Sequence, residues 1–257
     1  MKKNNKEEKM KNEMMNDNII DPEYNDGIAK NELDVFFVID NSGSMAGEKI
    51  NAVNNAIRDV MSIMPDIQDE TSNVTIKINS LVFNNYANWT YNEPQEVENF
   101  KWNDIPAIGG TDYSAVCDAL TMTLSKRKNG GIMPDFGGVA PIIIFMSDGE
   151  PNTDWASSLW ELNKRGWFKV ALKYAIAIQV HSSQAKNELA KFTGSDERVI
   201  QVSTAEALRK LIKAIAVTSS QVKSQSSTTN SNFGTSINTQ VDQEIKNNLQ
   251  DVNGITW

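Results

Sequence analysis

The residues best suited to chemistry lie in a short polar stretch that directly follows a run of apolar residues. Asp40, Ser42 and Ser44 stand at positions i, i+2 and i+4, and residues 35–39 before them are continuously apolar. A continuous rather than alternating apolar run is typical of a strand that is buried on both faces. One carboxylate and two hydroxyls are therefore expected on a tight loop at the carboxyl end of a buried strand, where open α/β sheets bind ligands.

Three oxygens on one short loop suit a small, hard cation such as Mg²⁺. Clusters of Asp, Ser and Gly also occur in turns and at helix starts, so this stretch alone leaves a capping role open. Two later segments favour the metal. Thr111 follows Gly109 and Gly110 just before an apolar helical pattern, and Asp148 follows a second apolar run at 139–146. The sequence thus predicts a five-oxygen set, which consists of Asp40, Ser42, Ser44, Thr111 and Asp148.

These three segments resemble the metal-ion-dependent adhesion site (MIDAS) of von Willebrand factor A (vWA) domains, which has the pattern Asp-x-Ser-x-Ser with a later Thr and Asp. Within that family the chain is similar to the bacterial tellurium-resistance (TerY-like) type. The similarity rests on D-x-S-G-S-M-x-G-E at 40–48, G-G-T at 109–111 and D-G-E-P at 148–151. It covers residues 33–218 and implies a Rossmann-like, doubly wound α/β sheet. That sheet is mainly parallel, with one short antiparallel edge strand and helices on both faces.

The resemblance also implies a ligand and partners. The five oxygens would hold a divalent cation, with Mg²⁺ preferred and Mn²⁺ or Ca²⁺ as alternatives, and some of them would reach it through water. An Asp or Glu of a protein partner would complete the shell. A role in tellurium resistance or stress response is implied, with a Ser/Thr kinase and a PP2C-type phosphatase as partners.

Residues next to the five ligands are expected to shape the loops. Glycines allow the backbone to approach an ion closely, and a carboxylate at a helix N-terminus is stabilised by the helix dipole. The expected supporting residues are Gly43, Gly47, Gly110, Asp112, Gly149 and Glu150. Trp155 and His181 follow two of the predicted strands and are candidates for a rim that contacts the partner. A core position for the tryptophan and an ordinary surface loop for the histidine are the alternatives.

Strand and helix patterns alternate through the middle of the chain. The predicted strands are residues 34–40, 74–83, 139–146, 169–180 and 198–202, with a short edge strand at 86–91 that continues at 95–100. The predicted helices are residues 45–64, 112–128, 152–164 and 184–193, and one that begins near Ser203. Pro65 is expected to end the first helix. This alternation predicts a mainly parallel sheet, and right-handed crossovers bring the three metal loops to one edge.

Composition divides the 257 residues into three parts. Residues 1–32 are charged and rich in Asn, and we expect them to be disordered. Residues 33–218 form the α/β domain. Residues 219–257 read as a tail rich in Ser, Thr, Asn and Gln. Within it Val241, Ile245 and Leu249 recur at helical spacing, which marks a short C-terminal helix.

The charge and the cysteine count restrict the function classes. The net charge is −8, which argues against binding to nucleic acid or to an anionic membrane. No apolar run is long enough to span a bilayer, and residues 1–14 lack the apolar stretch of a signal peptide. The single cysteine, Cys117, cannot form an internal disulfide. We therefore expect a cytoplasmic setting.

Two other function classes remain as alternatives. An Mg²⁺-dependent phosphohydrolase of the haloacid-dehalogenase type also places an Asp after its first buried strand. It needs a second Asp two residues later as acid/base, and Ser42 stands there. A secreted adhesin is disfavoured by the missing signal peptide. The sequence therefore favours a cytoplasmic, metal-dependent protein-interaction module that is not an enzyme and has no catalytic residues.

Overall fold

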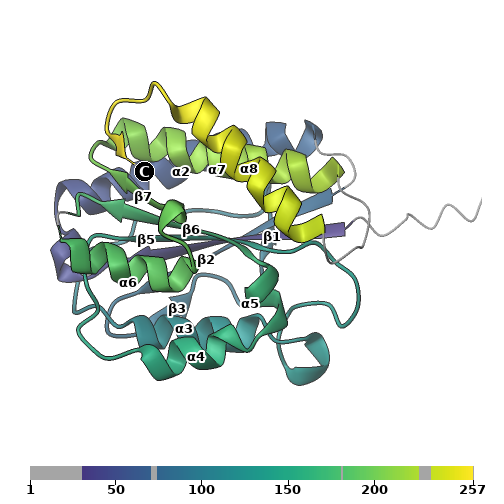
Figure 1. The fold of residues 1–257 in the computed structure, drawn as a ribbon, viewed down its shortest axis with the longest axis horizontal. Coiled ribbons are helices and arrows are strands. Elements are labelled where there is room, and N and C mark those ends of the chain that lie inside the picture. Colours follow the sequence, from purple (N-terminus) through teal and green to yellow (C-terminus); the bar gives the residue numbers. More distant parts are fainter. Residues whose placement is uncertain (1–30, 71–73, 181, 226–232, 257) are drawn as a thin grey trace, which may run out of the picture. The chain divides into compact units, whose positions relative to one another are not determined.

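The structure is a computed structural model that describes residues 31–70, 74–180, 182–225 and 233–256. These residues form one sheet of eight strands with helices on both sides (Figure 1). The order is β3-β2-β1-β5-β6-β7-β8, and β4 also pairs with β2. The strands are β1 (Asn31–Asp40), β2 (Val74–Phe83), β3 (Ala87–Trp89), β4 (Gln95–Glu96), β5 (Ile142–Ser147), β6 (Leu172–Ile178), β7 (Val199–Val202) and β8 (Ile255–Thr256).

Strand β1 lies near the middle of the sheet because nearly all of it is apolar. It pairs in parallel with β2 on one side and β5 on the other, and every residue from Leu33 to Asp40 is buried. Alternate side chains enter two separate cores. Phe37 and Ile39 pack into one, and Phe36 and Val38 into the other. Burial on both faces explains the unbroken apolar run in the sequence.

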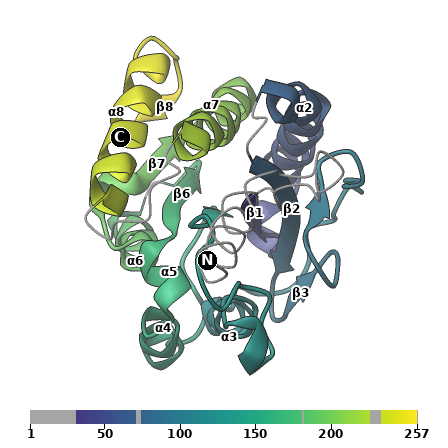
Figure 2. The same cartoon turned by 90° about the vertical axis from the view of Figure 1, so that its right-hand side faces the viewer.

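Two layers of helices cover the sheet. Helices α2, α7 and α8 pack on one face, and α3, α4, α5 and α6 on the other (Figures 1 and 2). The helices are α2 (Glu48–Glu70), α3 (Tyr113–Thr123), α4 (Ala156–Asn163), α5 (Gly166–Val170), α6 (Ser183–Thr193), α7 (Ala205–Gln225) and α8 (Phe233–Leu249). Three single turns of 3₁₀-helix, η1 (Gly43–Met45), η2 (Arg127–Asn129) and η3 (Asp196–Arg198), join them. In the described residues no helix is long and apolar enough to cross a membrane.

The predicted α/β fold is confirmed. Strands β2, β1, β5, β6 and β7 run in parallel, and β3 and β4 pair antiparallel to β2 at the expected edge. The other edge also carries an antiparallel strand, because β8 pairs with β7. This second antiparallel edge was not predicted from the sequence.

Helix α2 does not end at Pro65, as the sequence predicted, but continues to Glu70. Proline removes one helical hydrogen bond and crowds the preceding turn. Packing outweighs this cost, because Met64 and Ile67 stay buried on the inner stripe of the helix. The amide of Gln68 adds two bonds to the next strand. Its Nε2 donates to the Val74 carbonyl at 2.8 Å, and its Oε1 accepts from the Ile76 N–H at 2.6 Å.

The predicted strand at 169–180 is shorter in the structure. Residues Gly166–Val170 form the short helix α5, and β6 begins at Leu172. Phe168 on this turn is fully buried in the core beneath α3, α4 and α6. Residues 169–170, which the apolar pattern assigned to the strand, thus belong to this helical turn.

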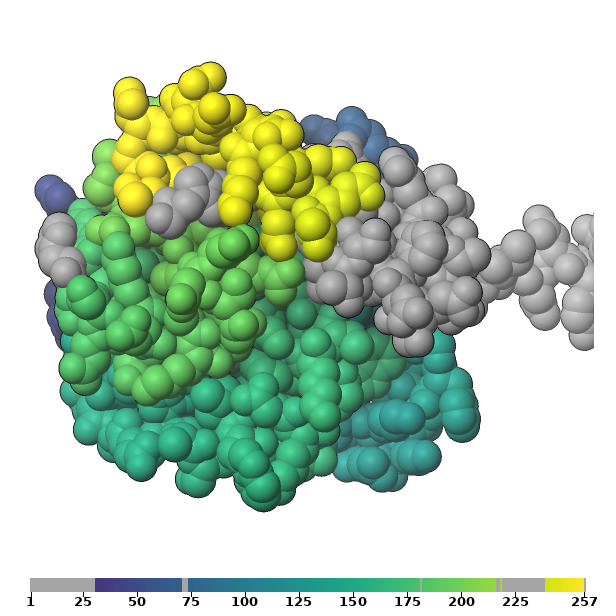
Figure 3. All heavy atoms as spheres, viewed as in Figure 1, coloured from purple at the N-terminus to yellow at the C-terminus, as the bar shows by residue number. Residues whose placement is uncertain are grey.

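The segment beyond residue 218, predicted as a tail, packs against the sheet unit in the described residues. Helix α7 extends to Gln225, and α8 lies against it with Val241, Ile245 and Leu249 buried in the same core. Figure 3 shows the yellow C-terminal residues lying directly on the green part of the chain. These three apolar residues lie on one stripe of α8, and Asp242 on the same helix bonds Tyr174 and Arg198. Residues 1–30 and His181 lie outside the described residues, so the predictions for them remain predictions.

Candidate metal centre

The predicted site lies where the carboxyl ends of β1 and β5 meet. Ile39 pairs with Met146, so Asp40 at the end of β1 stands beside Ser147 at the end of β5. The chain leaves β1 toward α2 on one face of the sheet and leaves β5 toward α4 on the other. Such a divergence of neighbouring connections opens a crevice where α/β sheets bind ligands.

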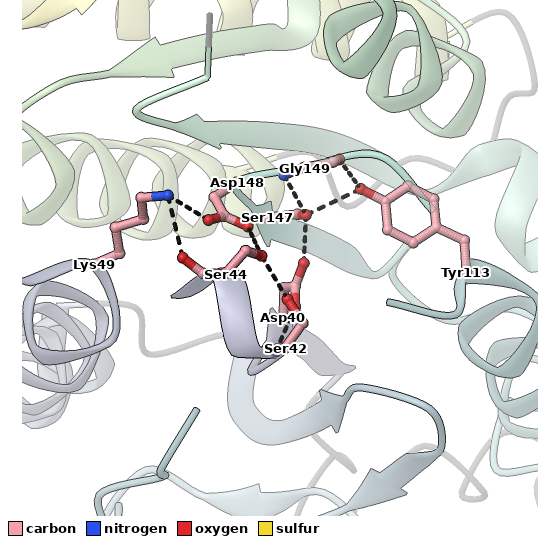
Figure 4. A network of polar contacts seen from close by, with 8 residues as sticks. All are labelled: Asp40, Ser42, Ser44, Lys49, Tyr113, Ser147, Asp148 and Gly149. Carbon is pink, nitrogen blue, oxygen red and sulfur yellow. Dashed lines mark hydrogen bonds and ion pairs between the residues drawn. The ribbon is translucent and has the colours of Figure 1, made fainter. Parts of the chain in front are cut away.

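Asp40 is fully buried and held by two hydrogen bonds. Its Oδ1 accepts from the Ser42 N–H at 2.8 Å, and its Oδ2 accepts from the Ser147 hydroxyl at 2.6 Å (Figure 4). Burial raises the pKa of Asp40, and the nearby charge of Asp148 adds to the increase, while the bonds from Ser147 and Ser42 oppose it. In the described residues no Lys, Arg or His forms an ion pair with Asp40. Neutral donors therefore orient the Asp40 carboxyl group without supplying a balancing positive charge.

The hydroxyls of Ser42 and Ser44 connect this region to Asp148. The Ser42 and Ser44 hydroxyl oxygens are 3.0 Å apart, and the Ser44 hydroxyl donates to Asp148 Oδ1 at 2.8 Å. Figure 4 shows the four side chains Asp40, Ser42, Ser44 and Asp148 gathered at one point. The structure therefore brings together four of the five predicted ligands.

The loop of Thr111 is tied to the first loop by backbone hydrogen bonding. The Gly43 N–H donates to the Gly109 carbonyl at 2.9 Å. Asn152 holds Thr111 from the other side, because its Oδ1 accepts from the Thr111 N–H at 2.6 Å and its own N–H donates to the Thr111 carbonyl at 2.8 Å. Within the described part of the chain the Thr111 hydroxyl has no hydrogen-bond partner. That hydroxyl is free to bind a ligand.

Several of the predicted supporting residues make contacts that shape the loops. Gly47 has a positive φ of 82°, which other residues rarely adopt. A side chain at Gly110 would come within 2.8 Å of Asn152. Asp112 caps α3, where its carboxylate accepts from the Ser114 and Ala115 N–H groups. Glu150 accepts a hydrogen bond from Ser182 at 2.6 Å, which ties the loop after β5 to the start of α6.

Trp155, predicted as a candidate rim residue, does not form an exposed rim. Its side chain is 3% exposed, its ring packs edge-on against Tyr113, and its Nε1 donates to Glu188 at 2.7 Å. An indole can be buried with a satisfied N–H, and Glu188 provides that partner. Trp160, one turn further along α4, is 62% exposed instead.

Sequence reasoning missed three residues that the structure places at the site. Ser147 donates to Asp40, and the Tyr113 hydroxyl lies 3.0 Å from the Ser147 hydroxyl and 2.9 Å from the Gly149 carbonyl. Lys49 Nζ lies 2.5 Å from Asp148 Oδ2. Position offered a signal for Ser147, which ends a buried strand next to Asp148. Nothing in the sequence pointed to Tyr113 or Lys49.

The donor set fits a hard divalent cation. It offers two carboxylates and three hydroxyls, all oxygen, as Mg²⁺, Mn²⁺ and Ca²⁺ prefer. Within the described residues no group of three or more His, Cys, Asp or Glu is arranged to hold a metal. A metal site made here thus depends on hydroxyl ligands, and its formal charge of −2 from Asp40 and Asp148 matches a divalent ion.

Comparison with known proteins agrees with the fold described above. The sequence profile of the von Willebrand factor type A domain matches residues 34–214, more than half of the chain. No curated protein matches the chain with significance.

Three solved structures share the fold. Proximal thread matrix protein 1 from the mussel byssus is 15% identical with a TM-score of 0.51, over 73% of this chain and 49% of that one. A von Willebrand factor type A protein from Catenulispora acidiphila is 13% identical with a TM-score of 0.51, over 74% and 42%. The pilus adhesin SpaC from Lactobacillus rhamnosus GG is 13% identical with a TM-score of 0.50, over 85% and 31%. The match thus spans less than half the length of each of these chains.

Proposed function

We propose that this chain, which belongs to the von Willebrand factor type A domain family, binds an acidic protein partner through a divalent cation. Domains of this family often have a MIDAS metal site and serve in protein interaction. The observation that carries the proposal is the connected set of Asp40, Ser42, Ser44 and Asp148 at the carboxyl ends of β1 and β5. Thr111 on the neighbouring loop would complete it.

The ion would supply an open coordination position for an incoming anion. The residues around it would determine what binds there. Asp40 and Asp148 offset the ion's charge, while the three hydroxyls bind without adding charge. An octahedral ion then keeps a position for water or for a partner's carboxylate. If Asp148 binds through water, the ion retains more of its positive charge and attracts the partner more strongly.

Ser147 and Tyr113 support this chemistry as positioning residues. The Ser147 hydroxyl donates to one oxygen of Asp40 and leaves the remaining lone pairs of the carboxylate for the ion. Tyr113 contacts the Ser147 hydroxyl and the Gly149 carbonyl, so it orients Ser147 toward Asp40 and ties the loop after β5 to the start of α3. Such bonds behind the ligands commonly contribute tenfold to a hundredfold to metal affinity.

A cleft beside the site offers surface for the partner. It has a volume of about 400 Å³ and begins at Glu150, two residues after Asp148. Its walls combine apolar, acidic and basic side chains, among them Pro151, Leu159, Trp160, Asp154, Glu188 and Lys191. A partner that reaches the ion with a carboxylate would contact this cleft with neighbouring residues.

The finer assignments belong to the proposal. We propose Mg²⁺ as the ion in the cell, with Mn²⁺ and Ca²⁺ as alternatives, and a cytoplasmic setting. A tellurium-resistance or stress-response system, with a Ser/Thr kinase and a PP2C-type phosphatase as partners, rests on the resemblance of the segments at 40–48, 109–111 and 148–151. Cell fractionation would test the setting directly.

The decisive experiment is affinity capture with the full chain, followed by identification of the bound proteins by mass spectrometry. The samples are wild type in Mg²⁺, wild type in chelator, and the double variant Asp40→Ala with Asp148→Ala. Asp34→Asn is a matched control, because it alters a buried carboxylate at the other end of the same strand. We expect a partner that wild type and the control retain in Mg²⁺ and the other samples lose. A partner retained equally in all samples would place the interaction elsewhere on the protein.

A further inference from the structure

The ammonium group of Lys49 lies among the predicted metal ligands. Its Nζ is 2.5 Å from Asp148 Oδ2 and donates to the Ser44 carbonyl at 3.2 Å (Figure 4). The lysine side chain is 25% exposed, whereas that of Asp148 is 1% exposed. The partly exposed ammonium of Lys49 therefore forms an ion pair with the buried carboxylate of Asp148, which the proposed function assigns to the metal.

The position of Lys49 in its helix is locally unfavourable. It is the second residue of α2, and the positive end of the helix dipole disfavours a cation in the first turn. Nearby Asp148 compensates for this cost. The pair is thus maintained by the metal loop rather than by the helix that carries the lysine.

Asp148 has two oxygens, and both are in use. Oδ1 accepts from the Ser44 hydroxyl and Oδ2 from Lys49. A divalent ion that binds Asp148 must share this carboxylate with the ammonium or displace it. Asp40 and Asp148 give the cluster a formal charge of −2, and Lys49 changes it to −1. The smaller negative charge weakens the attraction for a divalent ion.

We propose that Lys49 is a resident cation of the metal site, which competes with the divalent ion for Asp148 and lowers the affinity of the site for metal. This inference rests on the proposed function, because it assumes that Asp148 is a metal ligand. A metal ion held by Asp148 would displace the ammonium, and Lys49, which also donates to the Ser44 carbonyl, would remain near the ion as a cation that can attract the partner's carboxylate. Because Lys49 weakens metal binding but would attract the partner's carboxylate once displaced, it favours binding of the metal together with the partner over binding of the metal alone.

The test is isothermal titration calorimetry of Mn²⁺ and Mg²⁺ into the full chain. Lys49→Met removes the charge and keeps a side chain of similar length. Lys49→Gln is a second neutral variant, and Lys49→Arg keeps the charge. Lys164→Met, which removes an exposed lysine paired with Glu161 on α4, is the control. We expect the two neutral variants to bind Mn²⁺ about tenfold more tightly than wild type, with the arginine variant and the control within about twofold. The gain should shrink as KCl is raised, because salt screens charge interactions.

The outcomes separate this inference from the proposed function. If wild type binds metal and folded neutral variants bind it equally or more weakly, Lys49 is no competitor and the inference fails alone. If neither wild type nor any variant binds Mn²⁺ or Mg²⁺, the metal site itself fails and both are overturned. Circular dichroism of each variant shows whether it is folded, and agreement of the two neutral variants excludes an effect of one substituted side chain.

Discussion

Asp34 and Asp40 lie on the same strand and the same face of the sheet, and both are buried, but they have different neighbours. Asp34, at the amino end of β1, lies among charges. It pairs across the sheet with Lys77, and both Lys77 and Arg127 form ion pairs with Glu32. Burial and the charge of Glu32 raise the pKa of Asp34 to about 6, against the opposing effect of the two cations. Asp40, about 20 Å away, is surrounded by hydroxyl and N–H donors.

Burial raises the pKa of both carboxyls, but only Asp40 has the neighbours that the proposed metal site requires. Glu32 already engages the cations near Asp34, so a proton is the simplest way to neutralise that carboxylate. At Asp40 the donors of Ser42 and Ser147 fix the orientation of the two oxygens without supplying a positive charge. Burial is common to both sites. Oriented neutral donors and a second carboxylate distinguish the proposed metal site.

The largest effect should come from Asp40→Ala. Loss of a carboxylate ligand removes half of the negative charge of the set, so Mn²⁺ affinity should fall by more than about a hundredfold, beyond the usual effect of residues behind the ligands. Asp34→Asn should change it by less than about twofold. Titration calorimetry of both variants checks this, and a similar loss in both would abolish the distinction between the two ends of the strand.

Asp34→Asn should stabilise the protein at neutral pH. An acid whose pKa is raised on folding makes the folded state less stable once the pH exceeds the unfolded value of 3.8, and the cost is complete above about pH 6. A rise from 3.8 to about 6 corresponds to about 3 kcal/mol as an upper value. The variant should therefore exceed wild type in unfolding free energy at pH 7.5 and match it near pH 4. Urea unfolding at the two pH values, in chelator, measures the difference, and a gain that did not depend on pH would have another cause.

A third carboxylate, Asp242 on α8, has both a neutral hydroxyl donor and a cation as neighbours. It accepts from the Tyr174 hydroxyl and from the Arg198 guanidinium, with Nη2 at 2.9 Å from Oδ2. Asp242→Ala should lower the unfolding free energy by about 2 kcal/mol, because two charge-assisted bonds are lost. The affinity for Mn²⁺ should not change, because Asp242 is already paired with Arg198 and is not one of the proposed metal ligands. Thermal unfolding and Mn²⁺ titration on the same sample test both parts, and a change in affinity would show that α8 is coupled to the metal loops.

The smallest effect should come from Arg127→Gln. This side chain is 62% exposed and bonds Glu32 at 3.3 Å, so the ion pair is weak, and its loss should cost no more than about 0.5 kcal/mol. The pKa of Asp34 should rise slightly, because one of the two opposing cations is lost. Nuclear magnetic resonance titration of the Asp34 carboxyl carbon measures that shift. A fall in the pKa would mean that Glu32, released from Arg127, has moved away from Asp34.

The sequence was sufficient for features that local pattern determines. Unbroken apolar runs marked the central strands, and the spacing at Asp40, Ser42 and Ser44 marked the first metal loop. Contacts between distant segments could not be read in this way. Lys49 meets Asp148 and Tyr113 meets Ser147 only because parallel strands bring their ends together. Trp155 was predicted as a candidate rim residue. Its burial could not be predicted, because it depends on contacts with Tyr113 and Glu188, which are far away in the sequence.

The pairing of β8 with β7 has a consequence for self-association. An uncovered edge strand presents a row of N–H and C=O groups to which another copy of the chain can add. Here Ile255 pairs with Val202 and Thr256 with Gln201, and the Ser203 N–H donates to the Gly254 carbonyl at 2.9 Å. The helix α8 anchors this short strand by burying its own apolar stripe. The C-terminal segment thus covers the edge of β7 and disfavours edge-to-edge aggregation there. The opposite edge of the sheet carries only the short strands β3 and β4.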